Sequence, residues 1–251
     1  MNGGLIIVEG NIGAGKSTFA KTLAESLHGE YFAEPDEKTN PYLADYYDEY
    51  AGKIPPAGYA FKMQMHLLSR RYRAQKHAQS QIRDLGRGFV VMDRSYYGDV
   101  CFARVQHQIG LFDDRDYETY LCHHTDMKVH LEPPAMAIFL ETTPEVSRDR
   151  ISKRMSENAG RQIESDISLD YLHSLDVEIH KLANSLDGKT IVRRLDWNED
   201  KSPLDIRAKC NEIAAELALE EKSVYDFWTG TDGIGARDEL AKYTRRTARR
   251  G

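Results

Sequence analysis

Cysteines and long apolar runs are scarce in this sequence, and its net charge is not positive. The 251 residues include three cysteines, Cys101, Cys122 and Cys210, which lie far apart and form no C-x-x-C pair. This usage excludes a disulfide framework and a zinc cluster and is typical of a reducing compartment. No apolar run approaches the roughly 18 residues that a membrane-spanning helix needs, which excludes an integral membrane protein. The first residues hold no basic and apolar signal region, so we expect a cytoplasmic protein.

The charge balance bears on the kind of partner. There are 34 Lys and Arg residues against 40 Asp and Glu, which gives a formal net charge of −6. This balance argues against nucleic-acid binding over the whole surface, so we expect no nucleic-acid partner. The local exception is a basic tail at residues 245–250, which contains four arginines. With 41% hydrophobic residues the chain can build a core, which excludes wholesale disorder.

Short apolar runs alternate with helical patterns along most of the chain. The runs at 5–8, 89–92, 137–140 and 190–195 are apolar on both faces, as buried parallel strands are, and a further strand is expected just before Glu34. Helical spacing marks 18–27, 59–83, 145–155, 169–186 and a helix that starts after Ser202. The alternation predicts an α/β fold with a parallel sheet covered on both faces. The pattern decays after about residue 219, so we expect one domain over 1–219 and an extension with a basic tail over 220–251.

A glycine-rich loop follows the first predicted strand. It fits the pattern G-x-x-x-x-G-K-[ST], and the candidate residues for a bound nucleoside triphosphate are Gly10, Asn11, Gly13, Ala14, Gly15, Lys16, Ser17 and the following Thr18. Glycines let successive backbone N–H groups point at phosphate oxygens, and the helix N-terminus adds partial positive charge. Lys16 would reach the β- and γ-phosphates, and Ser17 would bind Mg²⁺. Alone, this loop leaves GTPases, motor ATPases and small-molecule kinases open.

Several later motifs resemble, in order, those of the deoxynucleoside kinase family (deoxycytidine, deoxyadenosine and deoxyguanosine kinases). The resemblance runs from about residue 5 to 217 and rests on Phe32-Ala33-Glu34-Pro35, on Gln64 with Arg71-Tyr72-Arg73-Ala74-Gln75, and on Asp93-Arg94-Ser95. It implies a P-loop kinase with a three-layer α/β/α fold and a helical lid. It also implies ATP and Mg²⁺ as cofactors, a homodimer and inhibition by the end-product triphosphate.

The resemblance assigns catalytic roles to Glu34, Arg94 and Lys16. Glu34 matches the base that takes the proton from the acceptor's 5′-hydroxyl, and Pro35 disfavours a helix there, so Glu34 is expected at a strand end where ligands bind. Asp93 matches the residue that holds the Mg²⁺ hydration shell. Arg94 matches one that braces the glutamate and the transferring phosphoryl group, which suits the planar guanidinium.

The expected base pocket consists of Gln64, Arg71 and Asp99. Gln64 and Arg71 lie seven residues apart and therefore share a helix face, and Asp99 matches an aspartate that pairs with the family's arginine. A buried Arg-Asp pair offers a charged acceptor to an exocyclic amine, which thymine lacks. The Asp-Arg-Ser form resembles bacterial purine deoxynucleoside kinases, which favours purines over cytosine. Tyr47 is the candidate sugar ligand, and Tyr50 competes for that role.

The expected lid and donor-base loop complete the site. Arg154 and Arg161 are the candidate clamps on the triphosphate, and Glu164 is the candidate partner of the sugar 3′-hydroxyl, with about five extra residues at 155–159 compared with the family's lid. Asp196 and Asp200 lie in a loop that resembles the family's donor-base loop.

These features predict an ATP-dependent kinase that phosphorylates the 5′-hydroxyl of a deoxynucleoside, with deoxyadenosine and deoxyguanosine favoured over deoxycytidine. The alternatives are a nucleoside monophosphate kinase, a kinase that acts on modified DNA, and a nucleotide-controlled binding module. Residues 34–64 contain only Lys38, Lys53 and Lys62 to hold a second phosphate, which disfavours the monophosphate kinase.

Overall fold

The computed structural model describes residues 3–35, 40–86, 88–157 and 167–229, with the backbone alone for 219–229. Five strands form one sheet in the order β2-β3-β1-β4-β5, and every neighbouring pair is parallel. The strands are β1 (Gly4–Gly10), β2 (Glu30–Phe32), β3 (Phe89–Asp93), β4 (Met136–Glu141) and β5 (Ile191–Asp196). After β1 the chain forms β2 at the sheet edge and then β3, which lies between β2 and β1. It then crosses to β4 on the other side of β1. The strand order therefore reverses beside β1, where open α/β sheets bind ligands.

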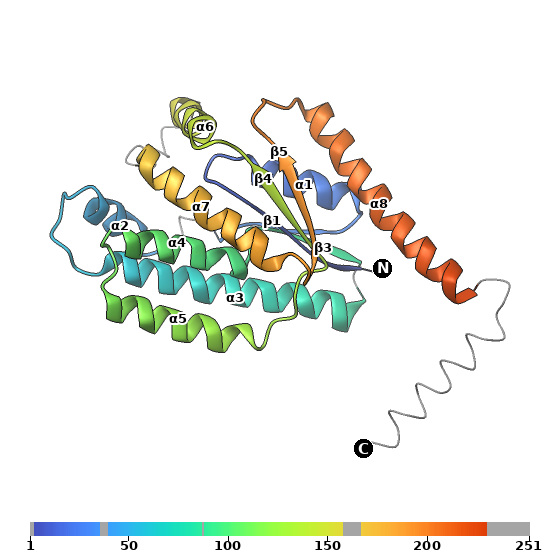
Figure 1. Cartoon of the computed structure of the whole chain (residues 1–251), viewed down its shortest axis with the longest axis horizontal. Coiled ribbons are helices and arrows are strands. Elements are labelled where there is room, and N and C mark those ends of the chain that lie inside the picture. The colour runs from blue at the N-terminus through green and yellow to red at the C-terminus, as the bar shows by residue number, and fades with distance from the viewer. Residues whose placement is uncertain (1–2, 36–39, 87, 158–166, 230–251) are drawn as a thin grey trace, which may run out of the picture.

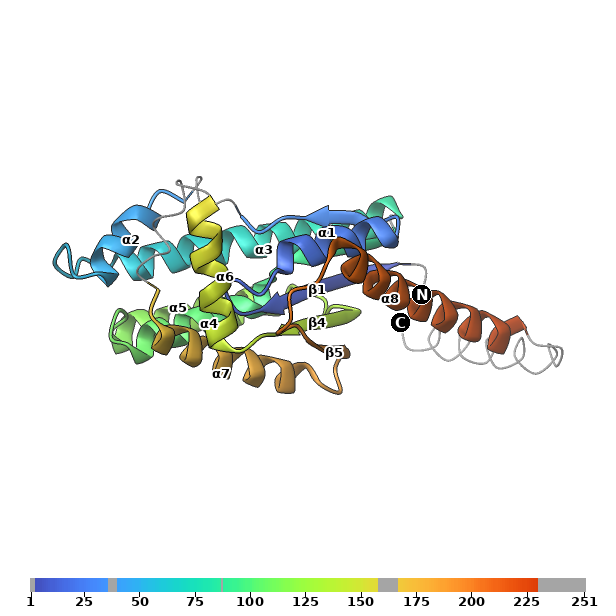
Figure 2. The same cartoon turned by 90° about the horizontal axis from the view of Figure 1, so that it is seen from above.

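Helices cover both faces of this sheet (Figures 1 and 2). One core joins the sheet to α1 and α8, and the other joins it mainly to α3, α4, α5 and α7. The helices are α1 (Lys16–Ser26), α2 (Leu43–Tyr50), α3 (Tyr59–Leu85), α4 (Tyr96–Gln108), α5 (Asp114–Lys128), α6 (Pro144–Glu157), α7 (Leu169–Leu186) and α8 (Pro203–Thr229). The expected three-layer α/β/α fold is confirmed. No helix in the described ranges is long and apolar enough to cross a membrane.

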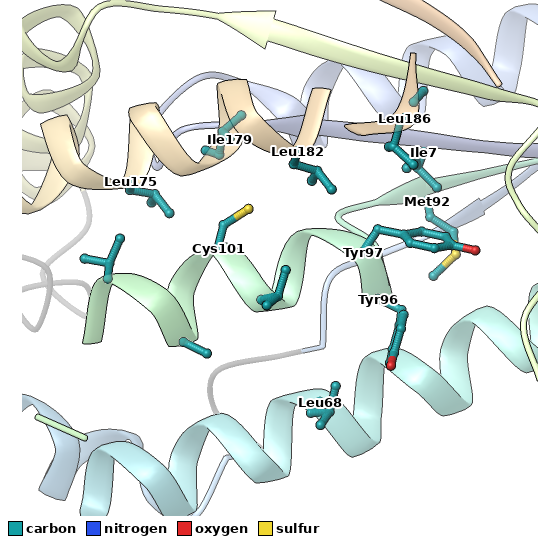
Figure 3. Close-up of a cluster of buried hydrophobic side chains, with 14 of the residues drawn as sticks. Ile7, Leu68, Met92, Tyr96, Tyr97, Cys101, Leu175, Ile179, Leu182 and Leu186 are labelled. Carbon is teal, nitrogen blue, oxygen red and sulfur yellow. The ribbon is translucent and has the colours of Figure 1, made fainter. Parts of the chain in front are cut away.

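The central strands are apolar on both sides because each face contributes to a different core. In β1, Ile6 and Val8 pack in the core with α1 and α8, and Leu5 and Ile7 pack in the other. Figure 3 shows the larger core, where side chains of α3, α4 and α7 meet those of β1 and β3. Burying one such aliphatic side chain stabilises the fold by about 1.5–3 kcal/mol. Between these two cores the carboxyl ends of β1 and β3 lie next to each other, with Val8 opposite Asp93.

Three helices were not expected from the sequence. Helix α2 has eight residues, too few to show a periodic stripe. Helix α4 is buried on almost every side. Its sequence YYGDVCFARVQHQ therefore lacks the continuous polar face that would reveal a helical period. Helix α5 is mostly polar, with Tyr120 and His124 as its buried residues. Helix α8 continues to Thr229 and so crosses the boundary expected near 219; the division into a domain and an extension stays a prediction.

Candidate active site

The glycine-rich loop joins the carboxyl end of β1 to the start of α1. Gly13 and Gly15 have φ values of 80° and 87°, in the left-handed region that favours glycine. A Cβ at Gly13 would lie 2.6 Å from the carbonyl oxygen of Ser147, so α6 leaves no room for a side chain there. The loop can therefore curl against α6 and present its N–H groups at the positive end of α1, as a phosphate site requires.

Lys16 is folded back into this loop. Its side chain is 6% exposed, and its Nζ donates to the backbone oxygen of Asn11 at 2.6 Å. Asn11 in turn donates to the backbone oxygen of Leu172 at 2.9 Å, which ties the loop to α7. Burial, with Arg94 adding to it, lowers the pKa of Lys16 to about 7. At neutral pH, Lys16 in the empty site therefore exchanges between its charged and its neutral form beside the phosphate loop.

We expect triphosphate binding to be coupled to proton uptake by Lys16. Phosphate charge stabilises the ammonium form and raises its pKa, so above the free-site value of about 7 the complex binds more protons than the empty protein. Calorimetric titration in buffers of different ionisation heat should show uptake that approaches one proton near about pH 8–9 and fades near about pH 6. The Lys16→Met variant should lose this uptake. Equal proton linkage at both pH values would contradict the account.

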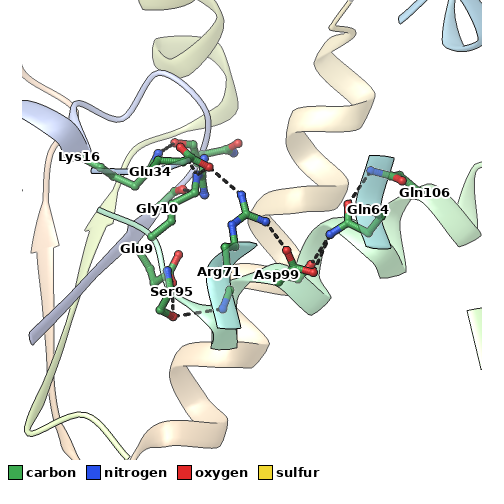
Figure 4. Close-up of polar contacts among 12 residues, drawn as sticks. Glu9, Gly10, Lys16, Glu34, Gln64, Arg71, Ser95, Asp99 and Gln106 are labelled. Atoms are coloured by element: carbon green, nitrogen blue, oxygen red, sulfur yellow. Dashed lines mark hydrogen bonds and ion pairs between the residues drawn. The ribbon is translucent and has the colours of Figure 1, made fainter. Parts of the chain in front are cut away.

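Glu34 lies two residues beyond β2, and its carboxylate faces the guanidinium of Arg71 (Figure 4). Its carboxylate pairs with Arg71 Nη2 at 2.6 Å and with Arg94 Nε at 3.1 Å, and its side chain is 36% exposed. Burial opposes the charged form, but Arg94, Arg71 and Lys16 outweigh burial and lower the pKa of Glu34 to about 2. The carboxylate is therefore charged at neutral pH and held in one place. A carboxylate with so low a pKa is a weak base, so it suits a reaction in which the proton leaves late, as a loose phosphoryl-transfer transition state allows.

Arg94 reaches this position from a strained backbone. Its φ is +62°, which is uncommon for a residue other than glycine, and its N–H donates to the backbone oxygen of Val8 at 3.0 Å. Its guanidinium contacts both Glu34 and the backbone oxygen of Gly10, the latter at 3.2 Å. The ring of Phe102 lies 4.7 Å from the Arg94 guanidinium carbon. Strain of this kind persists where the surroundings over-determine the residue, and here it points Arg94 at the phosphate loop.

A buried carboxylate that the sequence reasoning missed supports Arg94 from behind. Glu9 accepts hydrogen bonds from the Ser95 N–H at 2.9 Å and the Ser95 hydroxyl at 2.7 Å. The same hydroxyl caps α4 by accepting from the N–H groups of Tyr97 and Gly98. Burial raises the pKa of Glu9. Glu9 therefore links the carboxyl end of β1 to Ser95, the residue after Arg94.

The contact between Glu9 and Ser95 depends on Gly98, because the absence of a side chain at Gly98 leaves room for the Glu9 carboxylate. A Cβ at Gly98 would lie 2.5 Å from Glu9 Oε2 and 2.6 Å from Oε1. We expect Gly98→Ala to lose about 1–3 kcal/mol by overpacking, against a gain of about 1 kcal/mol in helix propensity. It should also lower kcat, since a displaced Glu9 releases Ser95 and Arg94. Thermal unfolding and kinetics measure both effects. Gly88→Ala, where nothing lies within 4 Å, is the control, and equal behaviour of the two variants would refute the role of Glu9.

The three expected base-pocket residues meet in a buried cluster. Arg71 forms an ion pair with Asp99 as well as with Glu34, so one guanidinium joins the expected base pocket to the expected catalytic carboxylate. Gln64 donates to Asp99 Oδ2 at 2.8 Å, and the hydroxyl of Tyr120 donates to the same oxygen at 2.6 Å. Gln64, Arg71 and Asp99 are at most 3% exposed. The charges of Arg71 and Asp99 are paired, as burial of such groups requires, while Arg71 Nε is buried without a hydrogen-bond partner among the described residues.

The side chains expected at a metal site also lie together. Asp93 Oδ1 is buried and has no hydrogen-bond partner among the described residues, and Asp93 Oδ2 accepts from the Tyr31 hydroxyl at 3.4 Å. The same hydroxyl hydrogen-bonds with Ser17. No group of three or more His, Cys, Asp or Glu side chains in the described ranges could hold a metal alone. The pair Ser17 and Asp93 therefore fits Mg²⁺ that takes its other ligands from a triphosphate and water.

The lid and the donor loop are placed in part. Arg150 on α6 holds the loop after β5: it donates to the backbone oxygens of Trp197, Asn198 and Glu199 and pairs with Asp200 at 3.2 Å. This loop borders a hollow of about 610 Å³ lined by residues that include Asp196, Trp197 and Asp200. Arg154 lies in the last turn of α6. Arg161 and Glu164 lie outside the described residues.

Two other placements bear on the sequence predictions. Tyr47 and Tyr50 both lie on α2; Tyr47 packs against Tyr46 with ring centroids 5.0 Å apart, and the Tyr50 hydroxyl donates to Ser168 at 3.2 Å. Neither contact assigns the sugar, so that role stays a prediction.

The residues that sequence reasoning overlooked are Glu9, Gln106 and Tyr120. Gln106 lies seven residues after Asp99, but no helix was expected there, so this spacing did not point to a shared face.

Comparison with known proteins decides the family. A family model described as deoxynucleoside kinase matches residues 6–217. The chain belongs to the deoxynucleoside kinase family. The resemblance found in the motifs is thereby confirmed, as is the assignment to the phosphotransferases.

Relatives and solved structures of this kinase family agree. Deoxyadenosine kinase of Dictyostelium discoideum is 34% identical over 204 residues, which cover 81% of this chain and 76% of that protein. Deoxyguanosine kinase of the same organism is 33% identical over 210 residues, which cover 83% of this chain and 68% of that protein. A structure of deoxyadenosine kinase from M. mycoides with bound dATP superposes with a TM-score of 0.67 and 25% identity, covering 84% of this chain and 98% of that one.

Proposed function

We propose that this kinase transfers the γ-phosphoryl group of ATP to the 5′-hydroxyl of a purine deoxynucleoside. The observation that carries the proposal is the shared guanidinium of Arg71. It contacts Glu34, beside the phosphate loop, and Asp99, beside Gln64, so the proposed catalytic base and the proposed base pocket are one continuous site. Two relatives are named deoxyadenosine kinase and deoxyguanosine kinase, which supports a purine acceptor.

The proposed mechanism assigns each group a task that its position suits. The phosphate loop and Lys16 hold the triphosphate, Arg94 neutralises charge that develops on the transferring group, and Glu34 orients the acceptor hydroxyl and receives its proton. Ser17 and Asp93 would hold Mg²⁺, which when bound offsets phosphate charge. Most of the rate enhancement in such a site comes from positioning and preorganised charge.

We also propose roles for the lid arginines, the sugar ligands and the donor-base loop. Arg154 and Arg161 would clamp the triphosphate, Glu164 would bind the 3′-hydroxyl, and Tyr47 or Tyr50 would contact the sugar. Asp196 and Asp200 would border the donor base in the hollow that they help to line. We also propose a homodimer that works in the cytoplasm, and light scattering tests the dimer.

The direct experiment is a phosphoryl-transfer assay with ATP, Mg²⁺ and each of the four deoxynucleosides. We expect 5′-monophosphate products, with higher kcat/KM for deoxyadenosine and deoxyguanosine than for deoxycytidine and the lowest value for thymidine. Deoxyadenosine monophosphate as acceptor separates the nucleoside monophosphate kinase alternative. Turnover of the monophosphate, or of no nucleoside, would contradict the proposal.

A further inference from the structure

The start of α3 is capped by a side chain from another helix. The N-cap residue of α3 is Gly58, which offers no side-chain acceptor, and the first turn of α3 holds no acidic residue. Glu49, in the last turn of α2, supplies the acceptor. Its Oε1 accepts from the N–H groups of Ala57 and Gly58, the latter at 2.9 Å, and its Oε2 accepts from the N–H of Ala60 at 3.0 Å. The carboxylate thus satisfies N–H groups at the positive end of the α3 dipole.

This contact also sets how α2 lies beside the first turns of α3 (Figures 1 and 2). Glu49 is 8% exposed, and burial of a carboxylate is tolerated where hydrogen bonds satisfy it. A helix of eight residues is not stable by itself, so α2 depends on its neighbours. The connecting loop, residues 51–58, is mostly exposed and offers little packing between the two helices. The Glu49 carboxylate bridges this loop and ties α2 to α3 directly.

On its other side α2 is linked to the expected acceptor site by a chain of hydrogen bonds. Tyr46 of α2 hydrogen-bonds with Tyr171 in the first turn of α7, and Tyr171 hydrogen-bonds with Gln106 of α4. Gln106 donates to Gln64 at 3.1 Å, and Gln64 lies in the second turn of α3, next to the capped end. A change in the seating of α2 on α3 would therefore reach the acceptor site from both helices.

We propose that Glu49 is a positioning residue for the acceptor nucleoside: it fixes α2 against the start of α3 and so sets the separation between Tyr47 and Gln64, which these two helices carry. The inference rests on the proposed function, which places the sugar beside α2 and the nucleobase beside Gln64. The triphosphate side has separate supports, because the phosphate loop is tied to α7 by the bond from Asn11 to the Leu172 oxygen. Loss of the Glu49 contacts should therefore loosen the acceptor side alone.

The test is steady-state kinetics of Glu49→Gln with the deoxynucleoside that the unaltered protein phosphorylates best. Glutamine keeps the shape of glutamate, but its amide nitrogen is a donor and would meet a backbone N–H, another donor. We expect the KM for the nucleoside to rise at least about tenfold, because charged hydrogen bonds are lost, while kcat and the KM for ATP change less than about threefold. Calorimetric titration of the nucleoside should show the same loss of affinity.

A matched control comes from the neighbouring residue of α2. The side chain of Asp48 is 47% exposed and pairs with Lys53 at 3.4 Å, so Asp48→Asn should leave both KM values unchanged. If Glu49→Gln folds poorly, Glu49→Asp is the second variant, because it keeps the charge and its carboxylate is one methylene shorter. It should raise the KM for the nucleoside in the same selective way, by a smaller factor.

The outcomes separate this inference from the proposed function. Phosphorylation of deoxynucleosides with an unchanged nucleoside KM in both Glu49 variants would overturn the inference and leave the proposed function intact. The same holds if the KM values for ATP and for the nucleoside rise equally, or if kcat alone falls, since a general structural role acts in those ways. Absence of turnover on every deoxynucleoside by the unaltered protein would overturn both.

Discussion

Replacing Glu34 by glutamine should lower kcat by about 10²–10⁴-fold, the range in which a positioned general base contributes. Glutamine has the same shape, but it cannot accept the hydroxyl proton. It also leaves Arg71 and Arg94, which now share the carboxylate at 2.6 and 3.1 Å, without their negative partner. Arg71 keeps Asp99, so the base pocket should hold and the KM for the nucleoside should change less than about threefold. Steady-state kinetics with ATP and deoxyadenosine measure both constants.

The matched control is Glu132→Gln. Glu132 is a carboxylate whose side chain is 68% exposed, and its ion pair with Arg83 spans 3.6 Å at the surface. Surface pairs of this kind contribute little, so this variant should keep full activity. Near-normal kcat in Glu34→Gln would remove Glu34 from the mechanism. A loss confined to KM would show that Glu34 holds the nucleoside without acting on its proton.

Replacing Asp99 by alanine should destabilise the fold by about 3–5 kcal/mol, as breaking one side of a buried ion pair does. Arg71 is 3% exposed and would keep its charge with Glu34 as its remaining partner. Gln64 and Tyr120 would each lose a buried acceptor. Urea unfolding followed by tryptophan fluorescence gives the change in the free energy of unfolding.

Two further variants isolate the cause of that loss. Asp114→Ala removes an aspartate whose side chain is 99% exposed, and it should change stability by less than about 1 kcal/mol. The double variant Arg71→Met/Asp99→Leu removes both charges and should recover part of the stability, because apolar residues of similar volume can replace a buried pair. Equal stability of Asp99→Ala and Asp114→Ala would mean that the buried cluster does not hold these helices together.

The sheet could be predicted from the sequence because parallel strands that are buried on both faces appear in a sequence as short apolar runs. Residues 5–8, 89–92 and 137–140 all lie within observed strands. Helix α4 was not predicted, because it is buried on nearly all sides and has no polar face to give a helical period. Motif order brought out Glu34, Gln64, Arg71 and Asp99, and the structure places them in one cluster.

Residues that act through another side chain were harder to foresee. Glu9 lies just beyond the apolar run at 5–8, and its contacts with Ser95 join positions 86 residues apart. Gln106 reaches Gln64 over 42 residues, a contact between two helices that spacing within either helix does not reveal. The left-handed backbone of Arg94 likewise arises from tertiary contacts, because local propensity disfavours it.

A single binding measurement tests whether the phosphate loop and the Gln64 cluster form one site. The ligand is a bisubstrate compound in which adenosine and deoxyadenosine are joined through their 5′-oxygens by an oligophosphate bridge, titrated calorimetrically into the protein with Mg²⁺. We predict that it binds at least about a hundredfold more tightly than ATP, and that Lys16→Met and Gln64→Leu each weaken it strongly. Affinity no better than that of ATP, with Gln64→Leu without effect, would show that the two elements do not serve one cleft.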